Sequence, residues 1–380
     1  MGKTPFHITV QYSLILPAII TSILACSNSH GNKTDEDLIF KEDIELDNLK
    51  HHKAVPNDLV LIYDGGAHRN IKWDKSHFAP YIFTEKEGES NLLFDGFLFL
   101  EIKDGNGRGF ASGYEKAAAR KIEWEKLLEN FFIKNNAIHA LNEQIDELVK
   151  SRIIDGTIEK RKVILSIPEP IPNQKDWGEL KNQKMDFSNR KDRLAACEWY
   201  IEYAEQLFKK ANLKHVELVG FYWLAEEATN SRDLAKYVAN YIYKKGYDFY
   251  WIPYFNSDGY EEWQTLGFNQ IYYQPNYFFN ESVPYSQLEK ACQRAKDNFM
   301  HMEIEFDERV LASSGWGYRL SDYLDVFTKY GVFDTLKVAY YQGGDAFYQL
   351  SQSKDPEDQQ LYNRLTDIII KRQDVNFKKN

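Results

Sequence analysis

The sequence has few cysteines, only three in 380 residues. Cys26 lies near the N-terminus, while Cys197 and Cys292 each fall inside a helix-like pattern. Exported domains that depend on disulfides carry cysteines at much higher density. We therefore expect no disulfide framework, and we expect Cys197 and Cys292 to be core residues.

The chain also lacks an excess of positive charge. Lys and Arg total 47 against 57 Asp and Glu, which gives a formal net charge of −10. Binding to nucleic acid depends on clustered cations that release counterions from the phosphates. The composition therefore argues against nucleic acid as a partner.

The apolar run near the N-terminus, from Leu14 to Ala25, is too short to span a membrane, which takes about 20 residues. A lysine precedes this run, and small residues and Cys26 follow it, as is typical of an export signal. Ile23-Leu24-Ala25-Cys26 resembles a bacterial lipobox, in which the cysteine becomes the lipidated first residue of the mature protein. A plain secretory peptide with an incidental cysteine is the alternative.

Three segments are expected along the chain. Residues 1–25 are a lipoprotein signal peptide, and residues 26–54 are a polar, acidic tether that buries no core. Residues 55–380 are one catalytic domain. The protein is then exported and held by its lipid on the outer membrane, at the cell surface or the periplasmic face, and it contacts the membrane only through this anchor. We expect a monomer.

Eight apolar runs of strand length follow the tether, at residues 58–66, 94–102, 162–170, 216–227, 248–255, 268–278, 299–308 and 336–344. Helix-like segments lie between several of them, for example a helix ending at Gly246 and one that Ser286 and Glu289 would open as a capping box. Eight strands that alternate with helices predict an α/β fold, a closed (β/α)8 barrel of the TIM type. The long intervals 103–161 and 171–215 predict helical insertions after strands 2 and 3.

Polar and aromatic side chains gather where the predicted strands end, which is where barrel enzymes carry their active sites. The polar residues expected to bind substrate are Asp64, Glu101, Gln274, Asn276 and Asp307. The aromatic residues expected to stack on the apolar faces of sugars are Trp223, Tyr254, Tyr277, Trp316 and Tyr341. The expected partner is therefore an oligosaccharide or polysaccharide.

Carboxylates dominate the ends of strands four and seven. Glu226 and Glu227 follow strand four, and strand alternation places Glu303, Glu305 and Asp307 on one face of strand seven. Three like charges on one inward face would repel one another if they were merely buried. The pattern therefore predicts a function for at least one of them.

Six motifs in order, "FDGFLFL", "GFYWLAEE", "WIPYF", "QPNYFF", "EIEFDE" and "YYQG", resemble an exported bacterial family of unknown function, DUF4855. The resemblance covers about Val55 to Tyr362 and implies a barrel that acts on carbohydrate. The layout is also similar to the large clan of barrel glycosidases, in which a Glu after strand four is the acid/base and a Glu after strand seven is the nucleophile. This likeness implies Glu226 as acid/base and Glu305 as nucleophile. The clan usually has Asn before the first of these, whereas this chain has Ala225.

Glycoside hydrolysis needs one protonated and one ionised carboxyl group. Apolar neighbours would raise the pKa of Glu226, and Arg309 is a candidate charge partner for Glu305. A carboxyl separation of about 5–5.5 Å would imply retention of configuration, which we expect, and about 6.5–9.5 Å inversion. No cofactor or metal is expected, and Asp64, His68 and Glu101 form the one cluster worth checking for a metal.

Several alternatives stay open. Glu226 and Glu227 could be solvated residues ahead of a helix that starts at Ser231, and Glu305 could form a structural pair with Arg309. The protein would then be a glycan-binding barrel without activity. Alternatively, Glu303 or Asp307 could take the role given to Glu305. The run "DGNGRG" at 104–109 is expected to be a flexible turn beside the cleft, because it lacks the ligand spacing of a calcium loop and the lysine of a P-loop.

Overall fold

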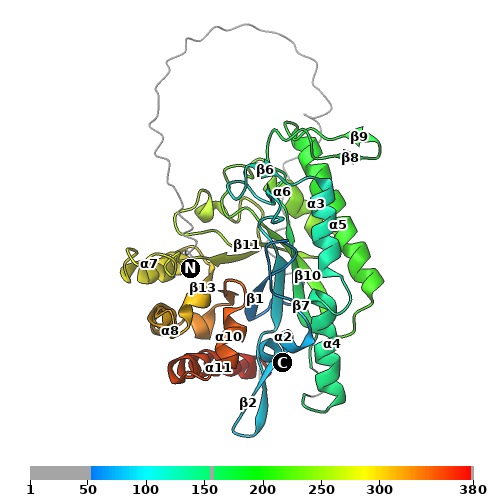
Figure 1. Ribbon diagram of the computed structural model, residues 1–380. Coiled ribbons are helices and arrows are strands. Elements are labelled where there is room, and N and C mark those ends of the chain that lie inside the picture. Colours follow the sequence, from blue (N-terminus) through cyan, green and yellow to red (C-terminus); the bar gives the residue numbers. More distant parts are fainter. Residues whose placement is uncertain (1–52, 155–157, 378–380) are drawn as a thin grey trace, which may run out of the picture. The chain divides into compact units, whose positions relative to one another are not determined.

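A computed structural model describes residues 53–154 and 158–377, with side chains described as far as Gln373. Its centre is a closed barrel of eight parallel strands in the order β1-β14-β13-β12-β11-β10-β7-β4 (Figure 1). The strands are β1 (Asp58–Tyr63), β4 (Gly96–Leu100), β7 (Arg161–Ile167), β10 (Val216–Trp223), β11 (Asp248–Trp251), β12 (Gln270–Tyr273), β13 (His301–Glu305) and β14 (Val338–Tyr341). They coincide with the eight apolar runs, so the predicted (β/α)8 barrel is confirmed.

Helices surround this barrel. They are α2 (Lys75–Ile82), α3 (Lys121–Phe131), α4 (Ala137–Lys150), α5 (Arg190–Ala211), α6 (Ala235–Lys244), α7 (Ser286–Asp297), α8 (Gly317–Lys329), α9 (Val332–Thr335), α10 (Ala346–Gln352) and α11 (Pro356–Phe377). Figure 1 shows α3, α4 and α5 together on one side of the barrel and α7, α8 and α11 on the other. Because side chains inside the barrel cover one face of each strand and helices cover the other, β1 and β4 are buried at every residue.

The two long intervals hold the predicted insertions. After β4 the chain forms the short strands β5 (Arg108–Gly109) and β6 (Ala117–Ala118) and then two helices, α3 and α4. After β7 it forms a hairpin of β8 (Glu179–Leu180) and β9 (Gln183–Lys184) before the long helix α5. A hairpin of β2 (Phe83–Lys86) and β3 (Glu89–Leu92), between β1 and β4, was not predicted.

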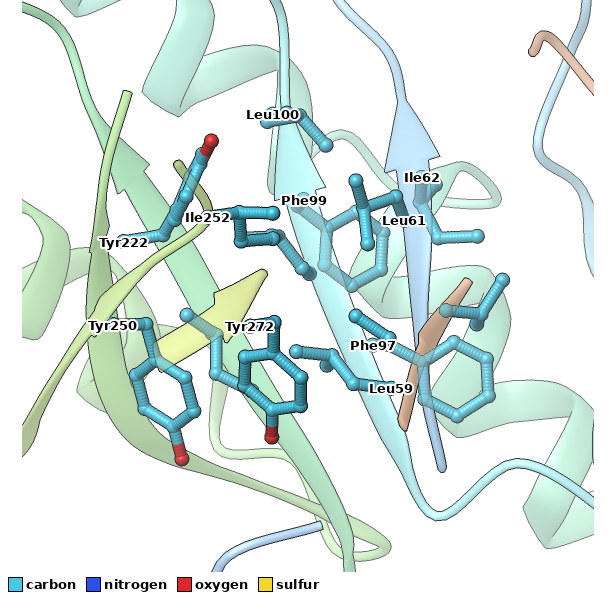
Figure 2. Close-up of a cluster of buried hydrophobic side chains, with 14 of the residues drawn as sticks. Leu59, Leu61, Ile62, Phe97, Phe99, Leu100, Tyr222, Tyr250, Ile252 and Tyr272 are labelled. Atoms are coloured by element: carbon cyan, nitrogen blue, oxygen red, sulfur yellow. The ribbon is translucent and has the colours of Figure 1, made fainter. Parts of the chain in front are cut away.

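Much of the aromatic content belongs to the core. Tyr250 of β11 and Tyr272 of β12 stack with their ring centroids 6.5 Å apart inside the buried cluster of Figure 2. Trp73, Trp124, Trp177, Trp223 and Trp251 are all fully buried. Cys197 and Cys292 are buried free thiols, as the sequence predicted.

The predicted capping box of α7 is wrong. Ser286 is the first residue inside this helix, Tyr285 occupies the N-cap position, and no side chain caps it. The carboxylate of Glu289 instead forms an ion pair with Lys329 of α8, at 2.7 Å. The ion pair with α8 therefore takes the place of the predicted capping interaction within α7.

None of the described helices combines the length and apolar character that crossing a bilayer requires. The expected signal peptide, Cys26 and nearly all of the expected tether lie outside the described residues.

Candidate active site

Glu226 and Glu305 lie at the end of the barrel where the strands terminate. Glu305 is the last residue of β13, and Glu226 follows β10 by three residues. The charge of Glu226 is among the causes that raise the pKa of Glu305, in agreement with their position at one end of the barrel. The structure therefore brings together the two residues predicted to be catalytic, from strands that β11 and β12 separate.

Glu305 is held by two donors. Its Oε2 accepts a hydrogen bond from the Tyr323 hydroxyl at 2.5 Å and another from the Asn276 backbone N–H at 2.6 Å. The side chain is only 2% exposed. Burial raises the pKa of Glu305 to about 7, although the hydrogen bonds from Tyr323 and Asn276 oppose this rise because they favour the ionised form.

Glu226 has a different environment. The residue is half-buried, so part of it remains open to solvent. Burial raises the pKa of Glu226 to about 7, opposed by hydrogen bonds from Gln274 and Tyr114 and reinforced by the charge of Glu227. The Gln274 amide is 3.5 Å from Oε1 of Glu226, a long hydrogen bond that stabilises the charge only weakly. Glu226 can thus carry a proton near neutral pH.

The predicted pairing of Glu305 with Arg309 is wrong. Arg309 binds Asp307 instead, with Nη2 2.7 Å from Oδ2 and Nε 2.9 Å from Oδ1. Its guanidinium also lies over the ring of Trp316, 4.3 Å from the centroid. Asp307 is two residues from Arg309 and can meet it locally, which leaves Glu305 to Tyr323 and Asn276. With its carboxylate engaged by Arg309, Asp307 does not take up its predicted role in binding substrate.

Glu303 is fully buried one alternation below Glu305 on β13. Among the described residues, neither of its carboxyl oxygens makes a hydrogen bond of normal geometry. Burial raises the pKa of Glu303 well above its ordinary range, and the charges of Glu305 and Glu226 raise it further. Both effects favour the protonated, neutral form of Glu303.

Trp223 is not a sugar platform, contrary to the prediction. It is fully buried, its indole N–H donates to the Ser231 hydroxyl at 2.8 Å, and its ring packs against Phe249. The preceding residue, Tyr222, is the one near the carboxyls, because the charges of Glu226 and Glu303 add to burial in raising its pKa. Strand alternation puts these neighbours on opposite faces of β10.

Tyr277 is likewise not available for stacking. It is 3% exposed, and the Arg319 guanidinium covers its ring at 3.7 Å from the centroid. Its hydroxyl donates to Asp322 of α8. The prediction for Tyr277 is therefore wrong, because the side chain fixes α8 against the loop after β12.

Three predicted aromatic residues, Tyr254, Trp316 and Tyr341, remain partly exposed. The Tyr254 hydroxyl donates to Glu227 Oε2 at 2.8 Å. Tyr341 meets Tyr63 edge-to-face at 5.7 Å. Their role in binding sugar stays a prediction.

Gln274 and Asn276 support the carboxyl pair directly. Gln274 reaches Glu226 through its amide, whereas Asn276 reaches Glu305 through its backbone N–H. Asn276 has a positive φ of 53°, a conformation that asparagine tolerates better than most residues. Both residues therefore position the carboxyl groups, in addition to any contact with sugar.

Asp64 and Glu101 lie across the barrel mouth, after β1 and β4. Glu101 is fully buried and held by Arg69, with Nε at 2.6 Å and Nη2 at 2.9 Å from its two oxygens. This ion pair occupies both oxygens, so Glu101 is not placed to bind substrate as predicted. Asp64 accepts hydrogen bonds from Asn130 and Asn136, and burial raises its pKa to about 6.

Asp64, His68 and Glu101 form the cluster that the sequence indicated as a candidate metal site. His68 is exposed, and its Nε2 lies 4.0 Å from Glu101. Among residues 53–154 and 158–377, no three His, Cys, Asp or Glu side chains are arranged to hold a metal ion.

Four tyrosines of the site were missed in the sequence: Tyr63, Tyr114, Tyr222 and Tyr323. Alternation along β1 and β10 could have indicated Tyr63 and Tyr222, since each shares a face with inward residues. Tyr114 lies in the insertion after β4 and Tyr323 on α8, and no local pattern connects either residue to the carboxyls.

Comparison with solved structures gives distant likenesses. A protein of Bacteroides thetaiotaomicron, provisionally named alpha-L-fucosidase, is 12% identical with a TM-score of 0.42, over 86% of this chain and 99% of that chain. A GH5-4 broad specificity endoglucanase from an uncultured bacterium is 12% identical, with a TM-score of 0.35, over 62% and 76%. The xylanase and alpha-amylase inhibitor protein XAIP-II of Scadoxus multiflorus is 14% identical, with a TM-score of 0.38, over 81% and 97%. TM-scores below 0.5 support no conclusion about activity.

No curated protein matches this chain. A family model does match, over residues 58–367, which include all eight strands of the barrel. The chain therefore belongs to the family described as domain of unknown function DUF4855.

Proposed function

We propose that this protein is a glycoside hydrolase in which Glu226 is the general acid/base and Glu305 is the nucleophile. One observation carries the proposal: the two carboxyl groups lie at the same end of the barrel, and their hydrogen bonds differ. Both carboxyl groups have a pKa raised to about 7. Glu226 is partly open to solvent and has a long hydrogen bond from Gln274, whereas short hydrogen bonds from Tyr323 and Asn276 favour the ionised form of Glu305. Such a division is what glycoside hydrolysis requires of a carboxyl pair.

The reaction then follows in two steps. Glu226 gives its proton to the glycosidic oxygen as the bond from that oxygen to the anomeric carbon breaks, and Glu305 forms an ester with this carbon. In the second step Glu226 takes a proton from water, whose oxygen displaces Glu305 from the same carbon. The product is a sugar of retained configuration, and both carboxyl groups return to their starting states.

The neutral Glu303 fits this assignment. Glu305 has to remain ionised beside it, and a second charge on the same buried face would raise the pKa of Glu305 further. A protonated Glu303 adds no such charge. The partly exposed aromatic side chains Tyr254, Trp316 and Tyr341 would contact the apolar faces of the sugars.

The second candidate is a glycan-binding protein without activity. The burial of Glu305 favours it, because a nucleophile has to reach the anomeric carbon and this side chain is only 2% exposed. In that case Tyr323, Asn276 and Glu305 would form a structural network that shapes a binding cleft.

A screen of glycans separates the two candidates. Purified protein is incubated with plant and host polysaccharides, and reducing sugar release and binding are both measured. We expect one glycan to be cleaved by the wild type and not by Glu305→Gln. A glycan that binds both proteins equally and is cleaved by neither would establish the binding protein and end the hydrolase proposal.

We also propose that Cys26 carries a lipid that anchors the exported protein. The lipobox-like Ile23-Leu24-Ala25-Cys26 after a short apolar run supports this. When cells that express the protein are grown with labelled palmitate, the wild-type protein should carry the label and the Cys26→Ser variant should not. Equal labelling of the two would reject the anchor.

A further inference from the structure

A polar cleft opens at the end of the barrel where β1 and β4 terminate. It has a volume of about 500 Å³ and lies between the end of β1, the loop of residues 101–120 and helix α3. Ligand sites usually measure about 300–1,000 Å³. The cleft is therefore large enough for at least one sugar unit.

Asp64 is a prepared acceptor in this cleft. The amides of Asn130 and Asn136 both bind its Oδ2, at 2.6 and 3.0 Å, and neither engages Oδ1. The residue is 6% exposed and lies in the wall of the cleft. A carboxylate fixed by two amides can receive a hydroxyl donor with little loss of side-chain entropy.

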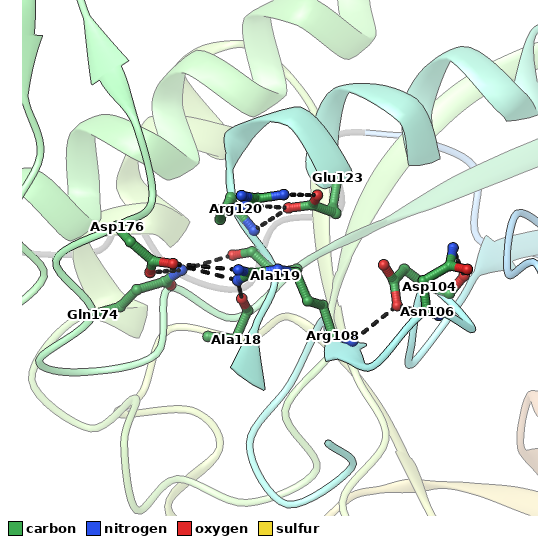
Figure 3. A network of polar contacts seen from close by, with 9 residues as sticks. All are labelled: Asp104, Asn106, Arg108, Ala118, Ala119, Arg120, Glu123, Gln174 and Asp176. Carbon is green, nitrogen blue, oxygen red and sulfur yellow. Dashed lines mark hydrogen bonds and ion pairs between the residues drawn. The ribbon is translucent and has the colours of Figure 1, made fainter. Parts of the chain in front are cut away.

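The guanidinium groups around the cleft are already paired, and outside these pairs its wall carries the carboxylates of Asp64 and Asp104 against the ammonium group of Lys126. Arg69 binds Glu101, and Arg120 binds Glu123 with Nε at 3.0 Å and Nη2 at 2.7 Å. Figure 3 shows the second pair beside Arg108, which donates to the Ala118 carbonyl and approaches Asp176. Paired guanidinium groups leave little net charge to attract an anion, and the Asp64 carboxylate would repel one. A neutral ligand rich in hydroxyl groups suits these walls better than an acidic one.

The loop on one side of the cleft is fixed by its own contacts. Asp104 Oδ1 accepts from the N–H groups of Asn106 and Arg108, at 2.7 and 2.9 Å (Figure 3). Gly105 has a φ of 77°, and a Cβ at this position would lie 2.5 Å from the backbone nitrogen of His68. The turn at 104–109, which was predicted to be flexible, is held by these contacts, and its close approach to the loop after β1 requires glycine at position 105.

Two connections link this cleft to the carboxyl pair. The same loop supplies Phe110 to the cleft wall and Tyr114 to a hydrogen bond with Glu226. The Arg69 guanidinium, which also lines the cleft, lies over the ring of Tyr63, 4.8 Å from its centroid. The charge of Glu226 contributes to the raised pKa of Tyr63. Tyr63 therefore connects Arg69 in the cleft wall with Glu226 of the carboxyl pair.

We propose that this cleft is a subsite for a neutral sugar unit beyond the two units that flank the bond cleaved at Glu226 and Glu305, with Asp64 accepting a hydrogen bond from a sugar hydroxyl. Apolar surface from Ile71, Phe110 and Leu127 would cover the hydrophobic face of the same unit. The inference rests on the proposed function in taking the ligand to be a glycan. It implies that the substrate is a neutral oligosaccharide or polysaccharide longer than a disaccharide.

Calorimetric binding tests the subsite apart from catalysis. The proteins are Glu226→Gln, which would hold glycans without cleaving them, and the same chain with Asp64→Asn added. In the second protein the carboxylate charge is lost, and the amide N–H₂ replaces an acceptor oxygen. The probes are disaccharides and hexasaccharides of cellulose, xylan, mannan and galactan, and the hexasaccharide of galacturonic acid. Asp334→Asn, at an exposed carboxylate by the opposite end of the barrel, is the matched control.

A neutral hexasaccharide should bind Glu226→Gln and bind about tenfold or more weakly once Asp64→Asn is added. The matching disaccharide is held only at the carboxyl pair, so its affinity should be the same with and without Asp64→Asn. A general structural defect would instead weaken the binding of both ligands. Asp64→Ser serves as a second variant if Asp64→Asn unfolds at a lower temperature than the control.

Three results would overturn the subsite: equal binding of the hexasaccharide with and without Asp64→Asn, preferred binding of the galacturonic acid hexasaccharide, or no binding of any probe. Hydrolysis of the same probes by the wild type is measured in a separate experiment. Binding that depends on Asp64, without any hydrolysis, would leave the subsite standing while the hydrolase proposal fails.

Discussion

The hydroxyl of Tyr323 on α8 donates a hydrogen bond to Oε2 of Glu305 on β13, at 2.5 Å. Both residues are buried, so the bond acts where water does not compete with it. It favours the ionised carboxylate and opposes the effect of burial on the pKa of Glu305. The outer ring of helices thereby sets the protonation of a residue inside the barrel.

Tyr323→Phe should move the acid limb of the activity profile to higher pH. Loss of the hydroxyl removes a donor that favours the charged form, so the pKa of Glu305 rises and less of the nucleophile is ionised at mildly acidic pH. The dependence of kcat/KM on pH measures this. Tyr277→Phe is the control, because its hydroxyl donates to Asp322 instead. An unmoved acid limb in Tyr323→Phe would contradict the role of this bond.

The alkaline limb should report Glu226. Its pKa is raised to about 7, chiefly by burial, and the acid step needs its proton, so the rate should fall as pH rises above about 7. The profile of kcat/KM for the wild type checks this. A rate that stays constant to pH 9 would show that no group of this pKa supplies the proton.

Glu303→Gln should stabilise the protein at alkaline pH. The folded-state pKa of Glu303 is raised, so its contribution to stability is complete below the unfolded pKa of about 4.3 and is lost as pH rises toward the folded value. Glutamine has nothing to ionise. We expect a thermal midpoint at pH 8 that is higher than the wild type by about 3 °C or more, with the difference disappearing near pH 4. An equal or lower midpoint at pH 8 would show that Glu303 is not held neutral.

Glu101→Ala should destabilise the fold strongly. It leaves the Arg69 guanidinium, whose side chain is 20% exposed, without the partner that holds it. Removing one member of a buried ion pair costs about 3–5 kcal/mol, which urea denaturation would measure. Glu125→Ala removes the partner of Lys121 at a more exposed pair and should cost about 0–1 kcal/mol. Equal effects of the two substitutions would contradict this account of Glu101.

The sequence predicted the barrel well because the strands are mostly apolar runs, as is typical of strands covered on both faces. It also placed Glu226 and Glu305 at the same end of the barrel, since the ends of parallel strands meet at one face of a barrel. Strand alternation could have shown that Tyr222 and Trp223 lie on opposite faces of β10. The prediction instead chose Trp223, the larger aromatic residue, as the one that stacks on sugar.

The partners of these residues could not be predicted in the same way. Arg309 is closer in sequence to Glu305 than Tyr323 is, yet Asp307 binds Arg309 and α8 supplies the tyrosine. Glu101 looked like a substrate ligand at a strand end, until the fold placed Arg69 beside it. Such contacts depend on how loops and helices dock, which no periodicity in the sequence records.

The central claim is that Glu226 and Glu305 act as a catalytic pair. It is tested most directly by kcat/KM on the glycan that the wild type cleaves fastest, for Glu226→Gln, Glu305→Gln and the control Glu261→Gln at an exposed carboxylate. We predict losses of about 10²–10⁴-fold or more for the first two and none for the control, with all three folded. A rate within tenfold of the wild type in either Glu226→Gln or Glu305→Gln would contradict the account.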